Sequence, residues 1–534
     1  MMLRYMEKQL SFHNSLYEKI PGHHLLKRIA RAVDFGFVNE LLSRNYCLHF
    51  GRPAKEPELM LKLLLLQRLY DLSDVRVIEE ASYNLAYLWF LGLNPEDTLP
   101  VPSLLAKFRT QRLEETQLDD IITEIVRQCV VRGIIEGTGI CVDTTHTKAN
   151  TTKKFPERIM KHLAKRIFKG LETDLGAVPA GVDTDIPAYN QAETHQEAKA
   201  TMQRYLEDVI AQAEEGAGCA TTQAIAQARG ILNDEKFILQ KGVRSLADTD
   251  ARVGNKSKTS QFYGYKSEIM MTTDERIITA VSVHSGDYVD GKGFKSLLDQ
   301  TLESGVDVRE VYGDKAYFRK DILEEIATRK ATSYIPVSAS VYKVDEELFA
   351  YNKDSDQWFC FMGNHTARKK RTKASQPGRS DILSYVFDEA QCVSCAYRAA
   401  CMKKSPRRAR ELRVALTAPI FYEHSQRQKQ PEFQAKYKKR AAQEWKNGEM
   451  KRFHGMARAK GWGLRSVAFQ VKITAMAVNL KRIAAISGGN SDGFCGLLCF
   501  FPAVAIIPIH RAGLNCGGLP FSAVSHDACV LYKK

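Results

Sequence analysis

The order of short apolar stretches between residues 139 and 337 limits what this chain can fold into. Gly139–Asp143 (GICVD) is a short apolar run that ends in an acid, as a central strand would. Phe262–Thr272 and Ile277–His284 are separated by the turn TDER, which predicts an antiparallel hairpin. Further strands are expected at Val308–Tyr312 and Ser333–Val337, and helices at Gly293–Leu302 and Lys320–Thr328. This order predicts an α/β fold with a mixed sheet flanked by helices.

Residues 1–135 carry a different pattern, with helix-length apolar spacing. Pro57–Leu93 contains two such stretches separated by DLSD, a turn with capping residues. Ser103 is expected to cap a short helix within Pro100–Leu113 that carries Lys107, Arg109 and Arg112. Short helices ending in basic residues resemble a helix-turn-helix-like DNA-binding module, and a plain helical bundle with solvated charges is the alternative.

Changes of composition divide the chain into five parts. The predicted boundaries are 1–135 (helical N-terminal DNA-binding domain), 136–338 (first part of the sheet-containing core, with a helical insertion at 155–247), 339–405 (an irregular, polar insertion with clustered cysteines), 406–486 (basic helical end of the core) and 487–534 (a tail). The tail holds seven glycines and an apolar run, Phe494–Ile509, that two prolines interrupt. Sixteen residues broken in this way are short for a transmembrane helix, so no membrane partner is expected.

Positive charge is concentrated near the C-terminus. The 534 residues include 77 Lys and Arg against 62 Asp and Glu, a formal net charge of +15. Between Met402 and Arg482 there are 21 basic and 5 acidic residues, so this segment holds the whole excess. A basic surface of this kind favours a polyanionic partner such as nucleic acid. The N-terminus lacks the apolar region of a secretory signal, which favours a reducing cytoplasm.

Two aspartates follow strands of the predicted sheet. Asp143 is expected to end the first strand, and Asp314 follows VREVY within GDKAYF. If these strands are neighbours, both carboxylates project into one cleft, where such a pair can hold a divalent metal close to phosphate. Each aspartate alone could equally be a turn residue. The pair therefore needs a third ligand.

A helix in the basic segment supplies a candidate for that ligand. Tyr437, Arg440, Glu444 and Lys451 fall within about 60° of one another on an ideal helix. An acid surrounded by these groups suits a metal-binding carboxylate whose neighbours contact phosphates, although a solvated surface face would show the same spacing. Glu449 lies on a different face and is the less favoured third acid.

Together these motifs resemble a known family. Tyr437-x2-Arg440-x3-Glu444-x6-Lys451 matches the Y-R-E-K signature of DDE transposases of bacterial insertion sequences. Asp143, in CVDTTHTKANT, looks like the first acid of that family, and Asp314, in VYGDKAYF, like the second. Two further segments are similar to parts of these enzymes: DARVGNKSKTSQFYGYK (Asp250–Lys266) and GRPAKEPELMLKLLLLQRL (Gly51–Leu69).

The resemblance implies a ribonuclease-H-like core that uses Mg2+ or Mn2+. It implies that Asp143, Asp314 and Glu444 are the catalytic acids and metal ligands, and that the DNA-binding residues of the signature are Tyr437, Arg440 and Lys451. The implied partner is double-stranded DNA, both transposon ends and target, bound by a homodimer in a synaptic complex. Such a protein would work in the bacterial cytoplasm, associated with the nucleoid.

Four cysteines form a second candidate site. Cys360 is followed by Cys392-x2-Cys395-x5-Cys401, and four thiols with one C-x2-C pair can close a tetrahedral Zn2+ site. A cluster of reduced thiols and a redox role are the alternatives. The isolated residues Cys47, Cys129, Cys141 and Cys219 are expected to be small buried side chains.

Three aromatic residues are weaker candidates. His146 could approach a metal bound at Asp143, His454 could help to bind DNA, and Trp358 could stack on a flipped base. A structural role is the favoured prediction for His146 and Trp358.

Three functions remain compatible with the sequence. The first is a metal-dependent transposase, the second a catalytically inactive DNA-binding protein derived from one, and the third a nuclease that cuts without joining. The three acids favour an enzyme, whereas the unusual tail favours the inactive derivative.

Overall fold

A computed structural model describes residues 11–47, 50–235, 237, 242–256, 259–373, 381–402 and 407–488. The apolar run Phe494–Ile509 and the last four cysteines lie outside these ranges. Among the described residues, no helix has the length and apolar character needed to cross a membrane.

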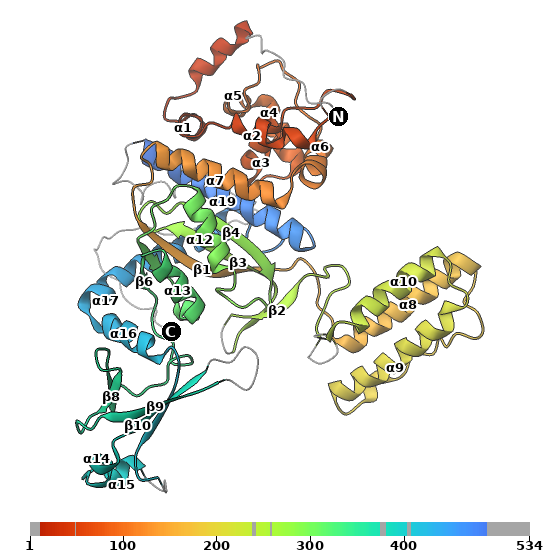
Figure 1. Cartoon of the computed structure of the whole chain (residues 1–534). Helices are drawn as coiled ribbons and strands as arrows, with labels where there is room; N and C mark the ends of the chain where they lie inside the picture. Colours follow the sequence, from red (N-terminus) through yellow and green to blue (C-terminus); the bar gives the residue numbers. More distant parts are fainter. Residues whose placement is uncertain are drawn as a thin grey trace, which may run out of the picture. The chain divides into compact units, whose positions relative to one another are not determined.

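A six-stranded mixed sheet forms the centre of the fold (Figure 1). Its strands are β1 (Gly139–Lys148), β2 (Arg252–Asn255), β3 (Gln261–Thr272), β4 (Ile278–Ser285), β5 (Glu310–Tyr312) and β6 (Thr332–Tyr334). The main order is β2-β3-β1-β5-β6, with β4 paired to β3. β1 is antiparallel to β3 and parallel to β5. The predicted mixed sheet and its β3–β4 hairpin are therefore confirmed.

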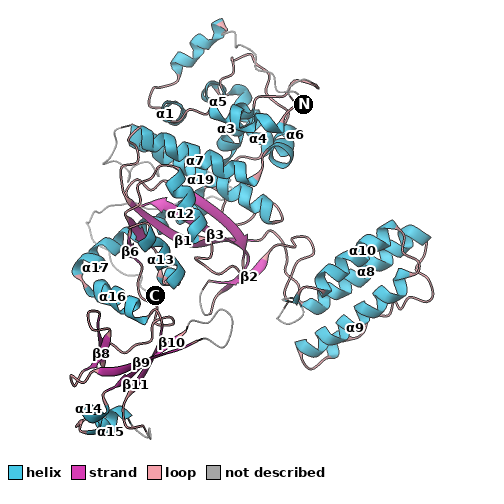
Figure 2. Cartoon of the chain, in the orientation of Figure 1, coloured by secondary structure: helices cyan, strands magenta, loops and turns pink. Residues whose placement is uncertain are grey.

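Helices cover both faces of this sheet (Figure 2). Alternate residues of β1 belong to different cores, because successive side chains of a strand point to opposite faces. Ile140 and Val142 pack in the core that includes α12 (Phe294–Glu303) and α13 (Lys320–Thr328). Cys141 packs in a second core, formed by β3, β5 and the two C-terminal helices α18 (Ala441–Phe453) and α19 (Leu464–Ser487).

The long helix α19 also completes the sheet beside β4. The Asn479 side chain, almost fully buried, accepts a hydrogen bond from the Ile278 N–H (2.8 Å) and donates one to the Ile278 carbonyl (2.7 Å). One amide group thus satisfies two backbone groups that a neighbouring strand would otherwise bind. This contact fixes α19 against the hairpin.

The N-terminal region is helical, as predicted. Its elements are η1 (Phe12–Lys19), α1 (Leu25–Ala32), α2 (Phe37–Leu42), η2 (Ser43–Asn45), α3 (Pro57–Leu69), α4 (Asp74–Tyr83), α5 (Leu85–Leu91), α6 (Pro102–Lys107), η3 (Phe108–Arg112) and α7 (Glu115–Val131). The buried side chains of these helices belong to the same core as Ile140 and Val142 of β1. The helices therefore pack directly on the face of the sheet that carries Ile140 and Val142.

Two details of the N-terminal prediction are wrong. Ser103 does not cap α6, because the helix starts one residue earlier at Pro102, a residue favoured in the first turn. Arg109 is not a solvated cation, since it forms an ion pair with Asp74 of α4. Arg112 likewise donates to the Asn45 carbonyl. These arginines hold helices together.

The helical insertion is a small bundle of its own. Its helices are α8 (Pro156–Leu175), η4 (Tyr189–Gln191), α9 (His195–Glu214) and α10 (Cys219–Leu232). Their buried side chains, such as Leu163 and Leu206, form a third core that is separate from the two cores of the sheet. The chain enters and leaves the bundle at Lys154 and Arg244, whose backbones exchange two hydrogen bonds.

Residues 339–405 are not irregular, contrary to the prediction. They contain β7 (Phe349–Asn352), β8 (Gln357–Cys360), β9 (Thr366–Thr372), β10 (Ile382–Phe387), α14 (Glu389–Val393) and α15 (Arg398–Met402), and β11 (Glu411–Ala415) follows. The strand order β11-β10-β9 makes one sheet, and β7-β8 makes a hairpin. Polar residues dominate because β9 is an edge strand exposed along most of its length. Trp358 is fully buried here, as favoured.

The basic segment is helical but broken near the signature. It consists of α16 (Ala418–Lys429), α17 (Pro431–Tyr437), the 3-10 turn η6 (Lys438–Arg440), α18 and α19. The ideal helix assumed for Tyr437 to Lys451 is therefore interrupted by a tighter turn between Tyr437 and Ala441. Tyr437, Arg440 and Ala441 all keep right-handed helical backbone angles, so the chain continues in nearly the same direction.

Candidate active site

The two aspartates stand at the same level of the sheet. β1 and β5 are adjacent and parallel, with Ile140 opposite Val311 and Cys141 opposite Tyr312. Asp143 comes two residues after Cys141 in β1, and Asp314 comes two residues after the end of β5, as the N-cap of the turn η5 (Lys315–Tyr317). Burial raises the pKa of Asp143, and the Asp314 carboxylate is close enough to raise it further. The prediction that the two strands are neighbours is confirmed.

Asp143 does not end its strand, contrary to the prediction. β1 continues to Lys148, because β3 pairs with it beyond the point where the three-residue β5 stops. Asp143 thus lies beyond the end of β5. After β5, Asp314 caps a 3-10 turn by accepting a hydrogen bond from the Ala316 N–H (2.8 Å).

The Asp143 carboxylate is largely buried, with 16% of its side chain exposed. Burial raises its pKa to about 6, and the nearby carboxylates Asp314 and Glu444 act in the same direction. The Arg440 guanidinium, 3.9 Å away, opposes this rise. An acid in this position is poised to exchange its proton for a cation near neutral pH.

Helix α18 lies over β1 with a matching repeat. Gln443 Oε1 is 3.1 Å from Cys141 Sγ, and Asn447 Nδ2 donates to Asp143 Oδ2 at 3.2 Å. Four residues of helix advance about 6 Å and two residues of strand about 6.8 Å. Residues four apart in α18 therefore contact residues two apart in β1. We did not predict Gln443 or Asn447 from the sequence, although Asn447 shares a face with Glu444 and Lys451 at spacings of three and four.

The signature residues surround Asp143. Arg440 donates to Glu444 Oε1 (3.1 Å) while its other nitrogen faces Asp143, so it links two of the three acids. Glu444 is 65% exposed and reaches into solvent from the first turn of α18. Tyr437 stacks on Phe433 at the edge of the core, and burial raises the pKa of Tyr437.

Lys451 lies two turns beyond Glu444. Burial and the neighbouring ammonium of Lys256 lower its pKa to about 8, while Asp143 acts in the opposite direction. His146 is packed against the Phe262 ring at 4.8 Å, and burial lowers the pKa of His146 to about 4. His146 is therefore a neutral packing residue near neutral pH, in line with the structural role that was favoured.

A buried network lies next to the two aspartates. The Tyr317 hydroxyl is 2.9 Å from Thr144 Oγ1; burial raises the pKa of Tyr317, and the nearby Glu268 carboxylate raises it further. Glu268 has no exposed surface and accepts from Tyr288 (2.7 Å) and from the Gly291 N–H (2.8 Å). Since Thr144 follows Asp143 and Tyr317 belongs to the turn capped by Asp314, this network couples the positions of both acids.

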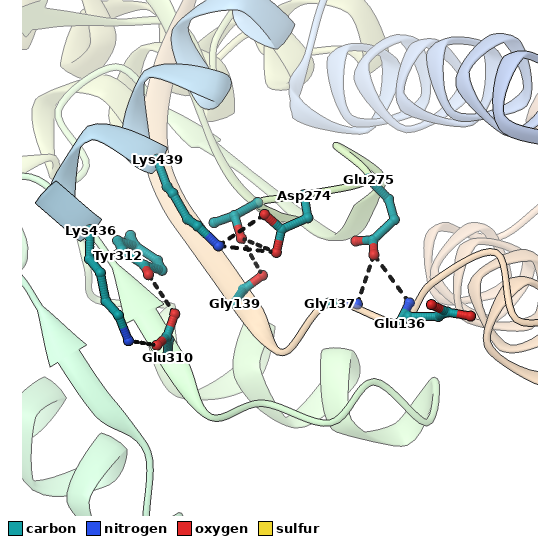
Figure 3. Close-up of polar contacts among 10 residues, drawn as sticks. Glu136, Gly137, Gly139, Asp274, Glu275, Glu310, Tyr312, Lys436 and Lys439 are labelled. Atoms are coloured by element: carbon teal, nitrogen blue, oxygen red, sulfur yellow. Dashed lines mark hydrogen bonds and ion pairs between the residues drawn. The ribbon is translucent and has the colours of Figure 1, made fainter. Parts of the chain in front are cut away.

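A second set of contacts fixes the turn before α18 (Figure 3). Lys436 forms an ion pair with Glu310 at the start of β5, and Glu310 also accepts from the Tyr312 hydroxyl at 2.6 Å. Lys439 donates to Asp274 of the β3–β4 turn at 3.0 Å. Lys436 precedes the break in the helix and Lys439 lies within it, and both hold it to the sheet (Figure 3).

Glu449 and His454 belong to a structural network. Glu449 pairs with the buried Lys446 (3.0 Å) and with Lys481 of α19 (3.1 Å). His454 is 1% exposed and its Nδ1 binds the Arg68 carbonyl of α3 at 2.8 Å. The hypothesis that His454 contacts DNA is therefore wrong, because the side chain joins the helical region to α18.

The residues around Asp143 suit a hard divalent cation by donor type. Carboxylates and an amide are the ligands that Mg2+ prefers. As they stand, however, the described residues include no group of three or more His, Cys, Asp or Glu side chains arranged to hold a metal ion. Glu444 is paired with Arg440 instead of facing the two aspartates.

The four clustered cysteines line one cavity, although among the described residues they too are not grouped tightly enough to hold a metal ion as they stand. Cys360 is the last residue of β8, and Cys392 lies in α14. Cys395 precedes α15, and Cys401 lies within it. All four line a cavity of about 420 Å³, and burial raises the pKa of Cys401. Among the isolated cysteines, Cys129 and Cys141 are buried as predicted, whereas Cys47 and Cys219 are exposed because they lie in a loop and at the start of α10.

Comparison with known protein families matches two segments of the chain. Residues 14–111 match a family described as a transposase domain (DUF772), and residues 359–484 match a family described as a transposase DDE domain. Both matches indicate an insertion-sequence DDE transposase. No curated protein matches the chain.

The matched segments cover different parts of the candidate site. The DDE segment contains the four clustered cysteines and the whole signature from Tyr437 to Lys451. Asp143 and Asp314 lie outside both matched segments. The matches therefore support a transposase function but do not extend to the two aspartates.

Proposed function

We propose that this protein cleaves DNA at the ends of an insertion sequence and joins the freed ends to target DNA in a metal-dependent reaction. The observation that supports the proposal is that Asp143 is largely buried on β1, beside β5, with Asp314 and Glu444 close enough to raise its pKa and with Asn447 of α18 bonded to it. The two transposase-domain matches support it. A ribonuclease-H-like description of the sheet is part of the same proposal.

Asp143, Asp314 and Glu444 are the proposed ligands of Mg2+ or Mn2+. These side chains would hold the metal, and its chemistry there would be activation of water and stabilisation of the leaving 3′ oxygen. Asn447 orients Asp143 through its amide, and Arg440 keeps Glu444 close by. No covalent intermediate with the protein is needed, since the freed 3′ hydroxyl is itself the nucleophile for joining.

Arg440, Tyr437 and Lys451 are the proposed contacts to the scissile end. Arginine and lysine bind phosphate oxygens, the former as a two-pronged donor and the latter as a point charge. Lys451, with its lowered pKa, sits beyond Asp143 along β1, where it can meet the phosphates that flank the cleaved bond. The surrounding basic segment adds salt-dependent affinity for duplex DNA.

The test combines the full chain, Mg2+ and duplex DNA that carries the terminal repeats flanking its own gene. We expect strand cleavage at the repeat ends and joining to a second duplex. Asp143→Ala, Asp314→Ala and Glu444→Ala should each abolish both products. Glu432→Ala, which removes an exposed acid from α17, is the matched control and should keep them.

Each alternative function has its own outcome in this assay. Binding without cleavage by the unaltered chain would establish a DNA-binding protein instead of an enzyme. Cleavage without joining would establish a nuclease. Loss of activity in Glu449→Gln but not in Glu444→Gln would identify Glu449 as the third acid.

We further propose that two copies of the chain act together in a synaptic complex, because two transposon ends must be held at once. Light scattering of the complex with a repeat-bearing duplex should give the mass of two chains and two duplexes. A complex of one chain and one duplex that still joins both ends would contradict this.

For the cysteine cluster we propose a structural Zn2+ held by Cys360, Cys392, Cys395 and Cys401. Four thiolates are the donor set that zinc prefers, and the four side chains line one cavity. The purified protein should contain about one zinc per chain. The double substitution Cys395→Ser/Cys401→Ser should lose it, while Cys47→Ser/Cys219→Ser should not. Unchanged zinc in the first variant would contradict the assignment.

A further inference from the structure

The three-stranded sheet β9–β10–β11 has two unlike faces. On one face Leu383, Tyr385 and Leu412 are buried, and the Tyr385 ring packs against Trp358. The opposite face consists of the alternate residues of each strand. These include Arg368, Lys370 and Arg413, which are exposed to solvent.

The cations of β9 alternate between paired and unpaired. Lys369 and Arg371, on the buried side, form ion pairs with Asp356 (2.5 Å) and Asp381 (2.6 Å). Arg368 and Lys370, on the open side, form no ion pair with any described residue. The strand therefore neutralises the charges that face the protein and leaves free the charges that face outward.

The open cations of β9 and β11 lie at the same level on either side of β10. Lys370 and Arg413 are both directly opposite Ser384, so the two cations lie roughly 10 Å apart with the buried Ser384 between them. Arg368 lies two residues along β9, roughly 7 Å away. The one acid of this face, Glu411, is paired with Arg407. A flat surface with three uncompensated cations results.

We propose that Arg368, Lys370 and Arg413 form a binding surface for the phosphate backbone of duplex DNA, separate from the signature helix. The choice of DNA as the polyanion rests on the proposed function. Charges on edge strands also prevent sheets from associating, but that role is served by either sign and by paired charges. Three cations that form no ion pair within the described residues, spread over two strands, are instead complementary to a regular array of phosphates.

The test measures binding of the full chain to a 40-base-pair duplex of mixed sequence, in EDTA so that no cleavage occurs, at a series of KCl concentrations. Each phosphate contact contributes about 0.9 to the slope of log affinity against log salt. Arg368→Gln/Lys370→Gln should lower the slope by about 1.8 and weaken binding on the order of tenfold or more at 100 mM KCl. Arg413→Gln alone should lower it by about 0.9.

A matched control separates position from net charge. Lys369→Gln/Arg371→Gln removes the same charge from the same strand on the other face, and its slope should equal that of the unaltered chain. Equal slopes for both double variants and for Arg413→Gln would overturn the proposal. So would a loss seen only with an RNA duplex of the same length.

These outcomes are independent of the catalytic proposal. A lowered slope without any metal-dependent cleavage would support the surface and reject the transposase chemistry. Cleavage that depends on Asp143, together with unchanged slopes, would support the transposase chemistry and reject the DNA-binding surface.

Discussion

At the scale of single residues, the candidate site holds carboxylates whose burial and mutual repulsion are unfavourable. Asp143 is largely buried and has two other carboxylates nearby, with one arginine to offset them. A protein selected for stability alone would not retain this arrangement, because a hydrogen-bonding amide would fill the same space without the charge. The strain is consistent with a site that is completed by a cation.

Asp143→Asn should therefore stabilise the metal-free protein. Because the folded-state pKa of Asp143 is raised to about 6, this carboxyl favours folding below pH 4, and that contribution is lost as the pH rises through 6. Above pH 6 the charged form costs about 1–3 kcal/mol, which the amide avoids. Urea unfolding in EDTA should show the variant to be more stable at pH 8 and equal to the unaltered chain near pH 4.

The control for this experiment is Asp314→Asn. Asparagine also caps the turn at Ala316, and the variant keeps the buried Asp143, so it should gain less stability at pH 8 than Asp143→Asn does. An Asp143→Asn variant that is less stable than the unaltered chain at pH 8 would contradict the assignment of Asp143 as a strained, buried carboxylate.

Tyr317→Phe should impair catalysis more than stability. The change removes the hydroxyl that bonds to Thr144 beside Glu268, at a cost of about 1–2 kcal/mol, and lets Asp143 and Asp314 shift relative to each other. We expect the rate of end cleavage to fall about ten- to a hundredfold. Single-turnover cleavage at saturating Mg2+ measures this effect.

Tyr312→Phe supplies the comparison. Its hydroxyl binds Glu310, on the side of the residue away from Asp314, and it is equally buried. A similar loss of stability with unchanged cleavage is expected. Equal losses of cleavage in both variants would show that general destabilisation, not the positioning of the acids, is responsible.

At the scale of elements, α18 brings the remaining side chains of the candidate site to the sheet. Its Gln443 and Asn447 follow β1 in step, while Arg440 and Glu444 project beside them toward Asp143. The break at η6 lets α17 bind β5 through Lys436 and lets α18 follow β1 independently. If the chain formed one straight helix through Tyr437 and Lys451, that single helix would have to contact both β5 and β1.

Gly448 tests whether the surface of α18 around this residue is open to solvent. It lies within the helix, and a Cβ at this position meets no atom within 4 Å. Gly448→Ala should raise the free energy of unfolding by about 0.5–1 kcal/mol, because alanine loses less backbone entropy in a helix. DNA cleavage should be retained, as measured in the same assay.

Gly170→Ala is the matched contrast in α8. There a Cβ would lie 2.9 Å from the Cα atom of Thr221 in α10, so the helices must move apart and stability should fall. Loss of DNA cleavage in Gly448→Ala with normal folding would indicate instead that DNA approaches the backbone of α18 at this glycine.

At the scale of the whole molecule, two insertions interrupt one α/β core. The helical bundle of α8–α10 has a core of its own, and the β7–β11 region packs on α16 through contacts such as Trp358 with Tyr422. The N-terminal helices share the main core with β1 instead of forming a separate one. The bundle is thus the part whose removal should disturb the rest least.

Replacing residues 155–243 with Asn-Gly should leave the remaining fold intact. Lys154 and Arg244 already exchange two backbone hydrogen bonds, and Asn-Gly is a favoured two-residue turn for such a pair. Calorimetry of the unaltered chain should show a transition that is absent from the shortened chain, whose remaining transition keeps its midpoint. Collapse to an unfolded chain would show that the bundle supports the core.

The sequence by itself determined the order of the main strands and helices up to Tyr334, because hydrophobic periodicity and turn residues are local properties. It missed the strands β7–β11, where polar residues hide the periodicity. The sequence also singled out Asp143, Asp314 and the signature helix, since helical spacing can be read along the chain. Only the tertiary structure decided what lies beside them. Asn447 on Asp143, the internal pairing of Arg109 and the burial of His454 depend on residues tens to hundreds of positions away. The two faces of the β9–β11 sheet, likewise, are distinguished only once strand register assigns each cation a side.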